Sequence, residues 1–268
     1  MISAGKRSVL GVHVDVVDYE AAVQRVIAAA HAQQPLAVSA LAVHGVMTGV
    51  QDAAHCARLN QLDLVTPDGQ PVRWALNWLY RAGLADRVYG PEMTWRILSR
   101  AAEEGLPVFL YGSSAEVLAR LTTRLRASLP NLTLAGSEPS RYRSIEPLEA
   151  HALADRLAAS GARIVLVGLG CPRQEMWAWY MRRHLSMPLV AVGAAFDYHA
   201  GTLRRPPAWM QRRGLEWAWR LALEPRRLWR RYLVLNPVFT ARLIAQKFRV
   251  WTPGATDLID PELSRIPG

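Results

Sequence analysis

Residues 162–175, ARIVLVGLGCPRQE, decide the fold class of this chain. The stretch opens with a continuous apolar run, which is typical of a strand buried on both faces. The run ends in Gly168 and Gly170. Pro172 then favours the start of a helix over 171–185, because proline is tolerated at the first helical position. A buried strand that runs directly into a helix is the repeating unit of a parallel α/β sheet.

The same alternation repeats along most of the chain. Other strand-like segments cover residues 9–17, 35–41, 62–69, 107–113, 131–136 and 188–197. Helical segments cover residues 18–33, 43–61, 71–82, 91–104, 114–128 and 146–160. Asp18 is placed to cap the first of these helices. We therefore predict an α/β fold: a Rossmann-like parallel sheet with helices on both faces, followed by a basic helical C-terminal appendage.

Charge and composition divide the chain into three parts. Residues 1–203 form the α/β core, residues 204–250 the appendage, and residues 251–268 a tail that we expect to fray. The net charge of +10 belongs to the segment 204–249, which holds 12 Lys/Arg and 2 Asp/Glu. Such a local excess predicts an anionic partner for the appendage rather than a generally basic surface.

Cysteine usage and hydropathy indicate the compartment. Cys56 and Cys171 form no disulfide framework, so a reducing cytoplasm is expected. The N-terminus lacks the apolar segment and the cleavage site of a signal peptide. No run of about 18 apolar residues is present, so we expect no membrane-spanning helix. Binding to a membrane surface stays compatible with the composition.

Four strand-like segments end in small or polar residues, and the carboxyl ends of parallel strands meet at one edge of a sheet. These ends carry TPDG, YGS, GLGCPRQE and GAAFD. Asp68 in TPDG suits a general base or a substrate ligand, although Asp-Gly is also a common turn signal. The glycines and helix N-terminus of GLGCPRQE suit a phosphate, whereas Glu175 there could simply offset the helix dipole. Asp197 in GAAFD could accept hydrogen bonds from a ribose or a base, or cap a loop.

Several common catalytic and cofactor motifs are missing from the sequence. The seven histidines show no paired ligand spacing, so we predict no bound metal. Neither a GxSxG elbow nor a GxxxxGK[ST] loop occurs, and no cofactor is predicted. These patterns leave the strand ends and the basic appendage as the candidate functional regions.

The segment 214–231, GLEWAWRLALEPRRLWRR, interleaves arginine and tryptophan with apolar residues. Glu224-Pro225 predicts a helix boundary, and Arg227 and Arg230 share a helix face because they are three residues apart. Guanidinium groups pair with phosphates, and tryptophans favour membrane headgroups. Three interpretations stay open: an anionic membrane contact, nucleic-acid binding by charge and stacking, or a solvated basic helix pair whose tryptophans pack on the core.

The chain resembles the WecG/TagA/CpsF glycosyltransferases, glycosyltransferase family 26, in an ordered set of motifs over roughly residues 9–249. The motifs are TPDG, RVYGPEM, PVFLYGS, IVLVGLGCPRQE, VGAAFDYHAGTLRRPPAW and GLEWAWRLALEPRRLWRR. The resemblance implies an inverting, metal-independent sugar transfer from a UDP-sugar to a polyprenyl-diphosphate-linked acceptor in bacterial exopolysaccharide or cell-envelope glycan synthesis. It also implies a cytoplasmic protein held peripherally, through the appendage, on the inner face of the cell membrane.

The resemblance assigns roles to residues by their place in these motifs. Asp68 in the DG motif is implied to be the general base. The appendage arginines Arg220, Arg227 and Arg230 are implied to close over the pocket and face the diphosphate. The nucleotide-sugar pocket is implied to include Gly112, Ser113, Gly170, Arg173, Gln174 and Asp197.

The chain departs from the family pattern after the second strand-like segment. Many members carry TxN there, whereas this chain has Ala40 and Ala42, and His44 is left to supply a polar contact to acceptor or donor. A catalytically inactive membrane scaffold on the same fold is therefore an alternative. A nucleic-acid-binding protein is another, although no recognition motif accompanies the charge and no nucleic-acid partner is expected. The sugar, the acceptor glycan and a homo-oligomeric state stay open.

Overall fold

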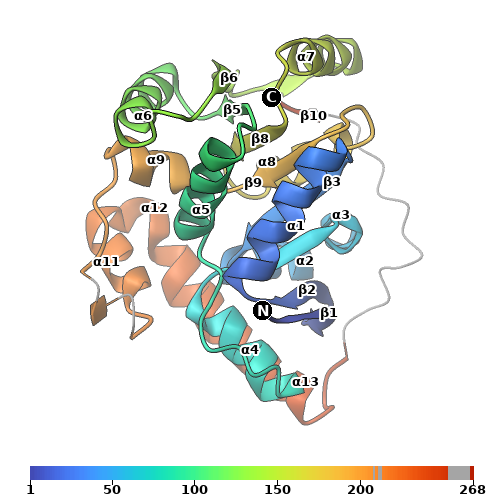
Figure 1. Ribbon diagram of the computed structural model, residues 1–268. Helices are drawn as coiled ribbons and strands as arrows, with labels where there is room; N and C mark the ends of the chain where they lie inside the picture. The colour runs from blue at the N-terminus through green and yellow to red at the C-terminus, as the bar shows by residue number, and fades with distance from the viewer. Residues whose placement is uncertain (208, 211–212, 253–265) are drawn as a thin grey trace.

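The computed structural model describes residues 1–207, 209–210, 213–252 and 266–268. Its centre is a six-stranded parallel sheet with the strand order β4-β3-β9-β8-β5-β6 (Figure 1). The predicted α/β fold is thereby confirmed. The six strands are β3 (Leu36–Leu41), β4 (Leu64–Pro67), β5 (Val108–Gly112), β6 (Leu134–Glu138), β8 (Ile164–Gly168) and β9 (Pro188–Ala191).

Helices cover both faces of the sheet because its strands are apolar on both sides. Along β8, Val165 and Val167 join one core cluster, while Ile164 and Leu166 join the other. One face packs against α1 (Tyr19–Ala32), α5 (Gly90–Glu103), α6 (Ala115–Ser128) and α9 (Ala195–Ala200). The opposite face packs against α2 (Val43–Gln51), α3 (Ala53–Gln61), α7 (Pro147–Ala159) and α8 (Arg173–Met181).

The first strand-like segment does not join the sheet. β1 (Ser3–Val9) and β2 (Val12–Val17) form an antiparallel hairpin of their own. The prediction that residues 9–17 belong with the parallel strands is therefore wrong, because residues 3–9 fold back and pair with β2 along one of its edges. The predicted helix 43–61 is also two helices, α2 and α3, and Asp52 caps α3 by accepting from the His55 N–H at 2.9 Å.

The C-terminal appendage is helical, as predicted. It contains α11 (Glu216–Leu223), α12 (Pro225–Trp229), the π-helical turn η1 (Arg230–Val234) and α13 (Leu235–Lys247). The predicted boundary at Glu224-Pro225 is confirmed. In Figure 1, α13 runs beside α4 (Gln70–Tyr80), and Lys247 Nζ donates to the Trp78 carbonyl oxygen at 2.7 Å. Buried side chains that anchor the appendage on the core include Leu228, Phe239 and Leu243.

The last residues of the chain are docked on the core. β10 (Ile266–Pro267) pairs antiparallel with β7 (Ser144–Ile145), and Ile266 is 2% exposed. The Gly268 N–H donates to the Arg143 carbonyl oxygen at 2.9 Å. The expectation of a frayed tail is therefore wrong for residues 266–268, because burial and strand pairing order them. Residues 253–265 lie outside the described part of the chain.

A substitution at Gly112 tests how closely the ends of β5 and β8 pack. Gly112 has a φ of +104°, and a Cβ added there would lie 2.8 Å from the Gly168 carbonyl carbon. We expect Gly112→Ala to lower the free energy of unfolding by about 3 kcal/mol, because backbone strain and overpacking act together. Urea denaturation measures the change.

Gly161→Ala is the matched control for this substitution. Gly161 has a φ of +75°, but no described atom lies within 4 Å of the position its Cβ would take. The control should lose only about 1 kcal/mol, the cost of the left-handed backbone alone. Equal losses in the two variants would show that contact with β8 does not constrain the end of β5.

Candidate active site

A cavity of about 620 Å³ opens at the carboxyl edge of the sheet. Its walls come from the residues at the ends of β3, β4, β5, β8 and β9, and the appendage covers one side. This edge is where polar groups gather, because parallel strands covered on both faces expose only their ends. The predicted site residues that line the cavity are His44, Asp68, Ser113, Gly170, Gln174, Asp197 and Arg220.

Asp68 lies directly after β4, between this cavity and a neighbouring one of about 120 Å³. Its N–H donates to the Leu41 carbonyl oxygen at 3.2 Å, and Gly69 completes the turn with a φ of +87°. Burial raises the pKa of the Asp68 carboxyl to about 6, with Arg87 opposing the rise and Glu216 adding to it. A carboxylate with such a pKa can accept a proton near neutral pH.

A series of buried hydrogen bonds between side chains holds the loop after β8 in place. Gln174 Oε1 accepts from the Gly170 N–H at 3.2 Å, and Gln174 Nε2 donates to Glu175 Oε1 at 2.9 Å. Ser39 Oγ donates to the same carboxyl oxygen at 3.0 Å. Desolvation by burial raises the pKa of Glu175. Glu175 therefore orients the Gln174 side chain at the cavity wall. This role goes beyond offsetting the dipole of α8.

Gly112 and Ser113 join the ends of β5 and β8. The Ser113 N–H donates to the Gly168 carbonyl oxygen at 2.8 Å, which needs the close approach that Gly112 permits. Ser113 lines the cavity, whereas Gly112 shapes the strand end behind it. The predicted pair thus splits into one residue that faces the cavity and one that supports it.

Arg173 is not among the described residues that line the cavity. Its Nη2 donates to the Gly268 carbonyl oxygen and lies 3.4 Å from Ser140 Oγ. Ser140 in turn donates to Gly268 at 2.8 Å and lines the cavity. Arg173 thus supports the loop after β6, although its place in the GLGCPRQE motif favoured a direct contact with the ligand.

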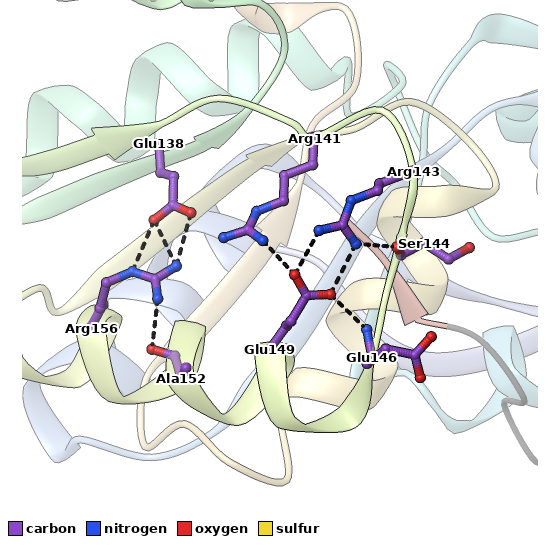
Figure 2. Close-up of polar contacts among 8 residues, drawn as sticks. All are labelled: Glu138, Arg141, Arg143, Ser144, Glu146, Glu149, Ala152 and Arg156. Atoms are coloured by element: carbon purple, nitrogen blue, oxygen red, sulfur yellow. Dashed lines mark hydrogen bonds and ion pairs between the residues drawn. The ribbon is translucent and has the colours of Figure 1, made fainter.

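The loop after β6 is clamped by ion pairs, as Figure 2 shows. Arg141 and Arg143 each contact Glu149 Oε1 at 2.6 Å, and Glu149 Oε2 accepts from the Glu146 N–H at 3.0 Å. Tyr142 in this loop lines the cavity, is 65% exposed and has a φ of +53°. Exposed ion pairs contribute little stability, so the clamp acts mainly by positioning the loop and its aromatic side chain.

Arg220 and Arg231 bring positive charge from the appendage to the cavity. The Nε of Arg220 is buried without a hydrogen-bond partner among the described residues. Arg230 is exposed instead, with its guanidinium 5.7 Å from the Trp229 ring centroid, and the Arg227 side chain lies outside the described residues. Arg231 was not predicted, although it is four residues after Arg227, a spacing that also places two residues on one helix face.

Two further predicted residues, Asp197 and His44, reach the cavity from helices. Asp197 lies in the first turn of α9, where the strand had been expected to continue, and Thr202 Oγ1 donates to its Oδ1 at 3.3 Å. His44 lies at the start of α2, and burial lowers its pKa to about 4, so it is neutral at pH 7. Its Nδ1 is buried without a hydrogen-bond partner in the described part of the chain. Ala40 and Ala42 also line the cavity, with apolar side chains.

A buried ion pair joins the appendage to the core beside Asp68. Arg87 Nη2 lies 2.5 Å from Glu216 Oε2, and the two side chains are only 9% and 10% exposed. Tyr89 and Tyr198 donate their hydroxyl groups to Glu216 Oε1. These four residues were missed by sequence reasoning. The available signal was Glu216 itself, one of two acidic residues in a strongly basic segment.

The cavity offers hydrogen-bonding and cationic groups to a ligand. Within the described residues, no group of three or more His, Cys, Asp or Glu side chains is placed to hold a metal ion. The lining combines the Asp68 carboxyl with the guanidinium groups of Arg220 and Arg231. Such a set can bind an anionic ligand and accept a proton from a bound hydroxyl.

The raised pKa of Asp68 predicts a pH-dependent stability effect. Folding favours the protonated carboxyl, so ionisation costs stability as the pH rises from about 4 through 6. Asp68→Asn removes this cost, and we expect it to raise the free energy of unfolding at pH 8 by about 1–2 kcal/mol, allowing for partial exposure. At pH 4 the difference should nearly vanish. Urea denaturation at both pH values tests this, and a variant that is less stable at pH 8 would contradict the burial of Asp68.

Comparison with known protein families connects this geometry to an activity. The model of the glycosyl transferase WecG/TagA/CpsF family matches residues 7–252, a range that spans every strand end at the cavity and the helical appendage. The motif-based resemblance is thereby confirmed, and it implies sugar transfer in cell-envelope glycan synthesis. The chain belongs to the WecG/TagA/CpsF family and is a glycosyltransferase that uses a UDP-sugar donor.

Proposed function

We propose that the protein is an inverting glycosyltransferase that moves a sugar from a UDP-sugar to a polyprenyl-diphosphate-linked acceptor. The observation that supports this most is that Asp68, with its raised pKa, lines the same cavity as Arg220 and Arg231. A base and two cations in one cavity suit a reaction in which a hydroxyl loses a proton while a diphosphate departs.

Asp68 is the general base in this proposal. The acceptor hydroxyl oxygen forms a bond to the anomeric carbon of the donor as the bond from that carbon to the UDP oxygen breaks. The hydroxyl proton passes to Asp68, and the electron pair of the broken bond leaves with UDP. Attack from the face opposite UDP inverts the anomeric configuration.

Arg220 and Arg231 face the departing diphosphate in this proposal. The Nε of Arg220 is buried and has no hydrogen-bond partner among the residues that the structure describes, so it is a donor to spare for a phosphate oxygen. A cation in a partly desolvated cavity stabilises developing negative charge more strongly than it would in water. Arg231 takes the role that the family resemblance implies for Arg230, which is exposed, while a diphosphate contact by Arg227 stays a prediction from the sequence.

The nucleotide-sugar is placed along the ends of β5, β8 and β9. Ser113, Gly170, Gln174 and Asp197 line that part of the cavity and offer hydrogen-bonding groups to the nucleotide and the sugar. Neutral His44 supplies a further contact to the donor or acceptor sugar, where the side chains of the neighbouring alanines cannot. The identity of the sugar is then a matter of which hydroxyl groups these residues reach.

We further propose that the appendage holds the protein peripherally on the inner face of the cell membrane. Its exposed side chains combine aromatic and aliphatic groups with basic ones, a mixture that suits anionic headgroups. Trp229 is 47% and Phe248 is 69% exposed. No helix within the described residues is long and apolar enough to cross a membrane. Further exposed apolar side chains of this region include Trp209, Trp217, Leu223, Leu233, Val234, Val238, Ile244 and Val250.

The reaction is tested by UDP release from a panel of UDP-sugars, with a short-chain lipid-diphosphate acceptor. We expect one sugar to support turnover, and Asp68→Asn to lower kcat about 100-fold or more, because the base is lost. Arg231→Gln should lower it by a similar factor, through loss of charge stabilisation. Arg230→Gln is the matched control and should lose no more than a few-fold. Full activity of Asp68→Asn would remove Asp68 as the base, and no transfer with any donor would favour the inactive scaffold.

Membrane contact is tested by co-sedimentation with vesicles of phosphatidylcholine, with and without phosphatidylglycerol. Binding should need the anionic lipid and weaken with salt, because the exposed charges are screened. Trp229→Ala combined with Phe248→Ala should weaken binding about tenfold or more, as apolar area is lost from the interface. Tyr142→Ala, which removes an equally exposed aromatic ring from the loop after β6, is the control. Equal binding of all three proteins would contradict the proposed surface.

A further inference from the structure

We propose that Glu216 is a positioning residue for the transfer reaction, whose carboxylate engages Arg87 and so leaves Asp68 free to act as the base. The proposal rests on the proposed function, and it assigns a role to an acidic residue of the otherwise basic appendage. Glu216 acts through Arg87 and Asp68 and is not proposed to touch the substrate.

The contacts of Glu216 account for both of its carboxyl oxygens. Oε2 accepts from Arg87 Nη2 at 2.5 Å, and Oε1 accepts from the Tyr89 hydroxyl and, at 3.4 Å, from the Tyr198 hydroxyl. Burial raises the pKa of Tyr198 to about 12 and that of Tyr89 well above its ordinary value, so both remain proton donors. A buried charge is tolerated only when it is paired and hydrogen-bonded, and Glu216 meets both conditions.

The Arg87 side chain makes two contacts within this network. Its guanidinium stacks over the Tyr89 ring, 4.2 Å from the centroid, while its Nη2 holds Glu216. The Arg87 side chain is thus paired with the appendage through Glu216. It also lies close enough to Asp68 for its charge to lower the pKa of that carboxyl. If Glu216 were neutral, Asp68 would become the natural partner of this cation, and a carboxylate paired with arginine is a poor base.

The balance of charge around Asp68 supports this assignment. Burial is the largest cause of the raised pKa of Asp68. The charge of Glu216 raises this pKa further, and the charges of Arg87 and Arg231 lower it. The titratable and charged groups that face Asp68, or share the smaller cavity with it, come from five elements or segments of the described chain. They include Tyr19 of α1, Arg87 and Tyr89 before α5, Glu216 and Arg220 of α11, Arg231 and Tyr232 of η1, and His44 of α2.

Glu216 also connects the base to the diphosphate site. Arg220 is four residues further along α11, so the two side chains leave the helix on one face. Both line the smaller cavity beside Asp68. The ion pair between Glu216 and Arg87 therefore does two things. It positions Arg220 beside the cavity, and it places the charge of Glu216 near Asp68.

The test is a ¹³C NMR titration of the Asp68 carboxyl in the full-length protein without substrate, with the signal assigned by its absence in Asp68→Asn. Glu216→Gln keeps the size of the side chain and an oxygen for Tyr89, but it releases Arg87. We expect the Asp68 midpoint to fall by about 1 pH unit. The acid limb of kcat/KM should shift to lower pH by the same amount, with a lower plateau because the base is weaker.

Two further variants separate this role from a merely structural one. Glu224→Gln removes the other acidic residue of the appendage and should leave the Asp68 midpoint unchanged. The double variant Arg87→Gln with Glu216→Gln removes both buried charges, and it should raise the midpoint, because the Arg87 charge has the larger influence on Asp68. If Glu216→Gln alone does not fold, the double variant still tests the proposal, because it leaves neither buried charge of the ion pair without its partner.

The outcomes for this proposal and for the proposed function are distinct. An Asp68 midpoint that stays in place in Glu216→Gln, or that moves the same way in the single and double variants, would overturn the role of Glu216. Wild-type protein in which Asp68 titrates near pH 6 but no UDP-sugar is turned over would instead overturn the proposed function. Opposite shifts in the two variants are the result that supports the proposal.

Discussion

Parallel strands that are buried on both faces leave only their ends for polar chemistry, and this constraint sets where the site lies. The six strands run in one direction, so their carboxyl ends meet at one edge and carry Asp68, Ser113, Gly170 and Gln174 to a shared cavity. These residues come from segments far apart in the sequence. Asp68 and Ser113 are each tied to a neighbouring strand end by a backbone hydrogen bond, whereas Gly170 and Gln174 are held by hydrogen bonds to each other. The scaffold thereby provides fixed positions at which a nucleotide-sugar can be held.

Desolvation at this edge sets the protonation of the groups that line it. Burial raises the pKa values of Asp68 and Glu175, and it lowers that of His44, because the charged form of each group loses water. The result is a carboxyl that can act as a base near neutral pH and an imidazole that stays neutral. The appendage deepens this effect, since it covers one side of the cavity and supplies Glu216.

The basic appendage is divided between two surfaces. Arg220 and Arg231 face the cavity, whereas Arg230 lies on the exposed side with Trp229. One helical segment can therefore contact a diphosphate within the site through one face and a membrane through its other face. The ion pair between Arg87 and Glu216 holds the segment in this orientation, because the buried charges are satisfied only when the appendage is docked on the core.

Hydrophobic patterning alone was enough to predict the α/β class, most strand and helix positions, and the strand-end residues, because buried parallel strands have an unmistakable apolar run and their ends must converge. The hairpin partner of residues 12–17, the docked residues 266–268, and the parts played by Arg173 and Arg231 depended on tertiary contacts. The pairing of Arg87 with Glu216 joins residues 129 positions apart, and no local pattern encodes such a contact. Periodicity tells which face of an element is buried, whereas only packing decides which distant side chain lies opposite it.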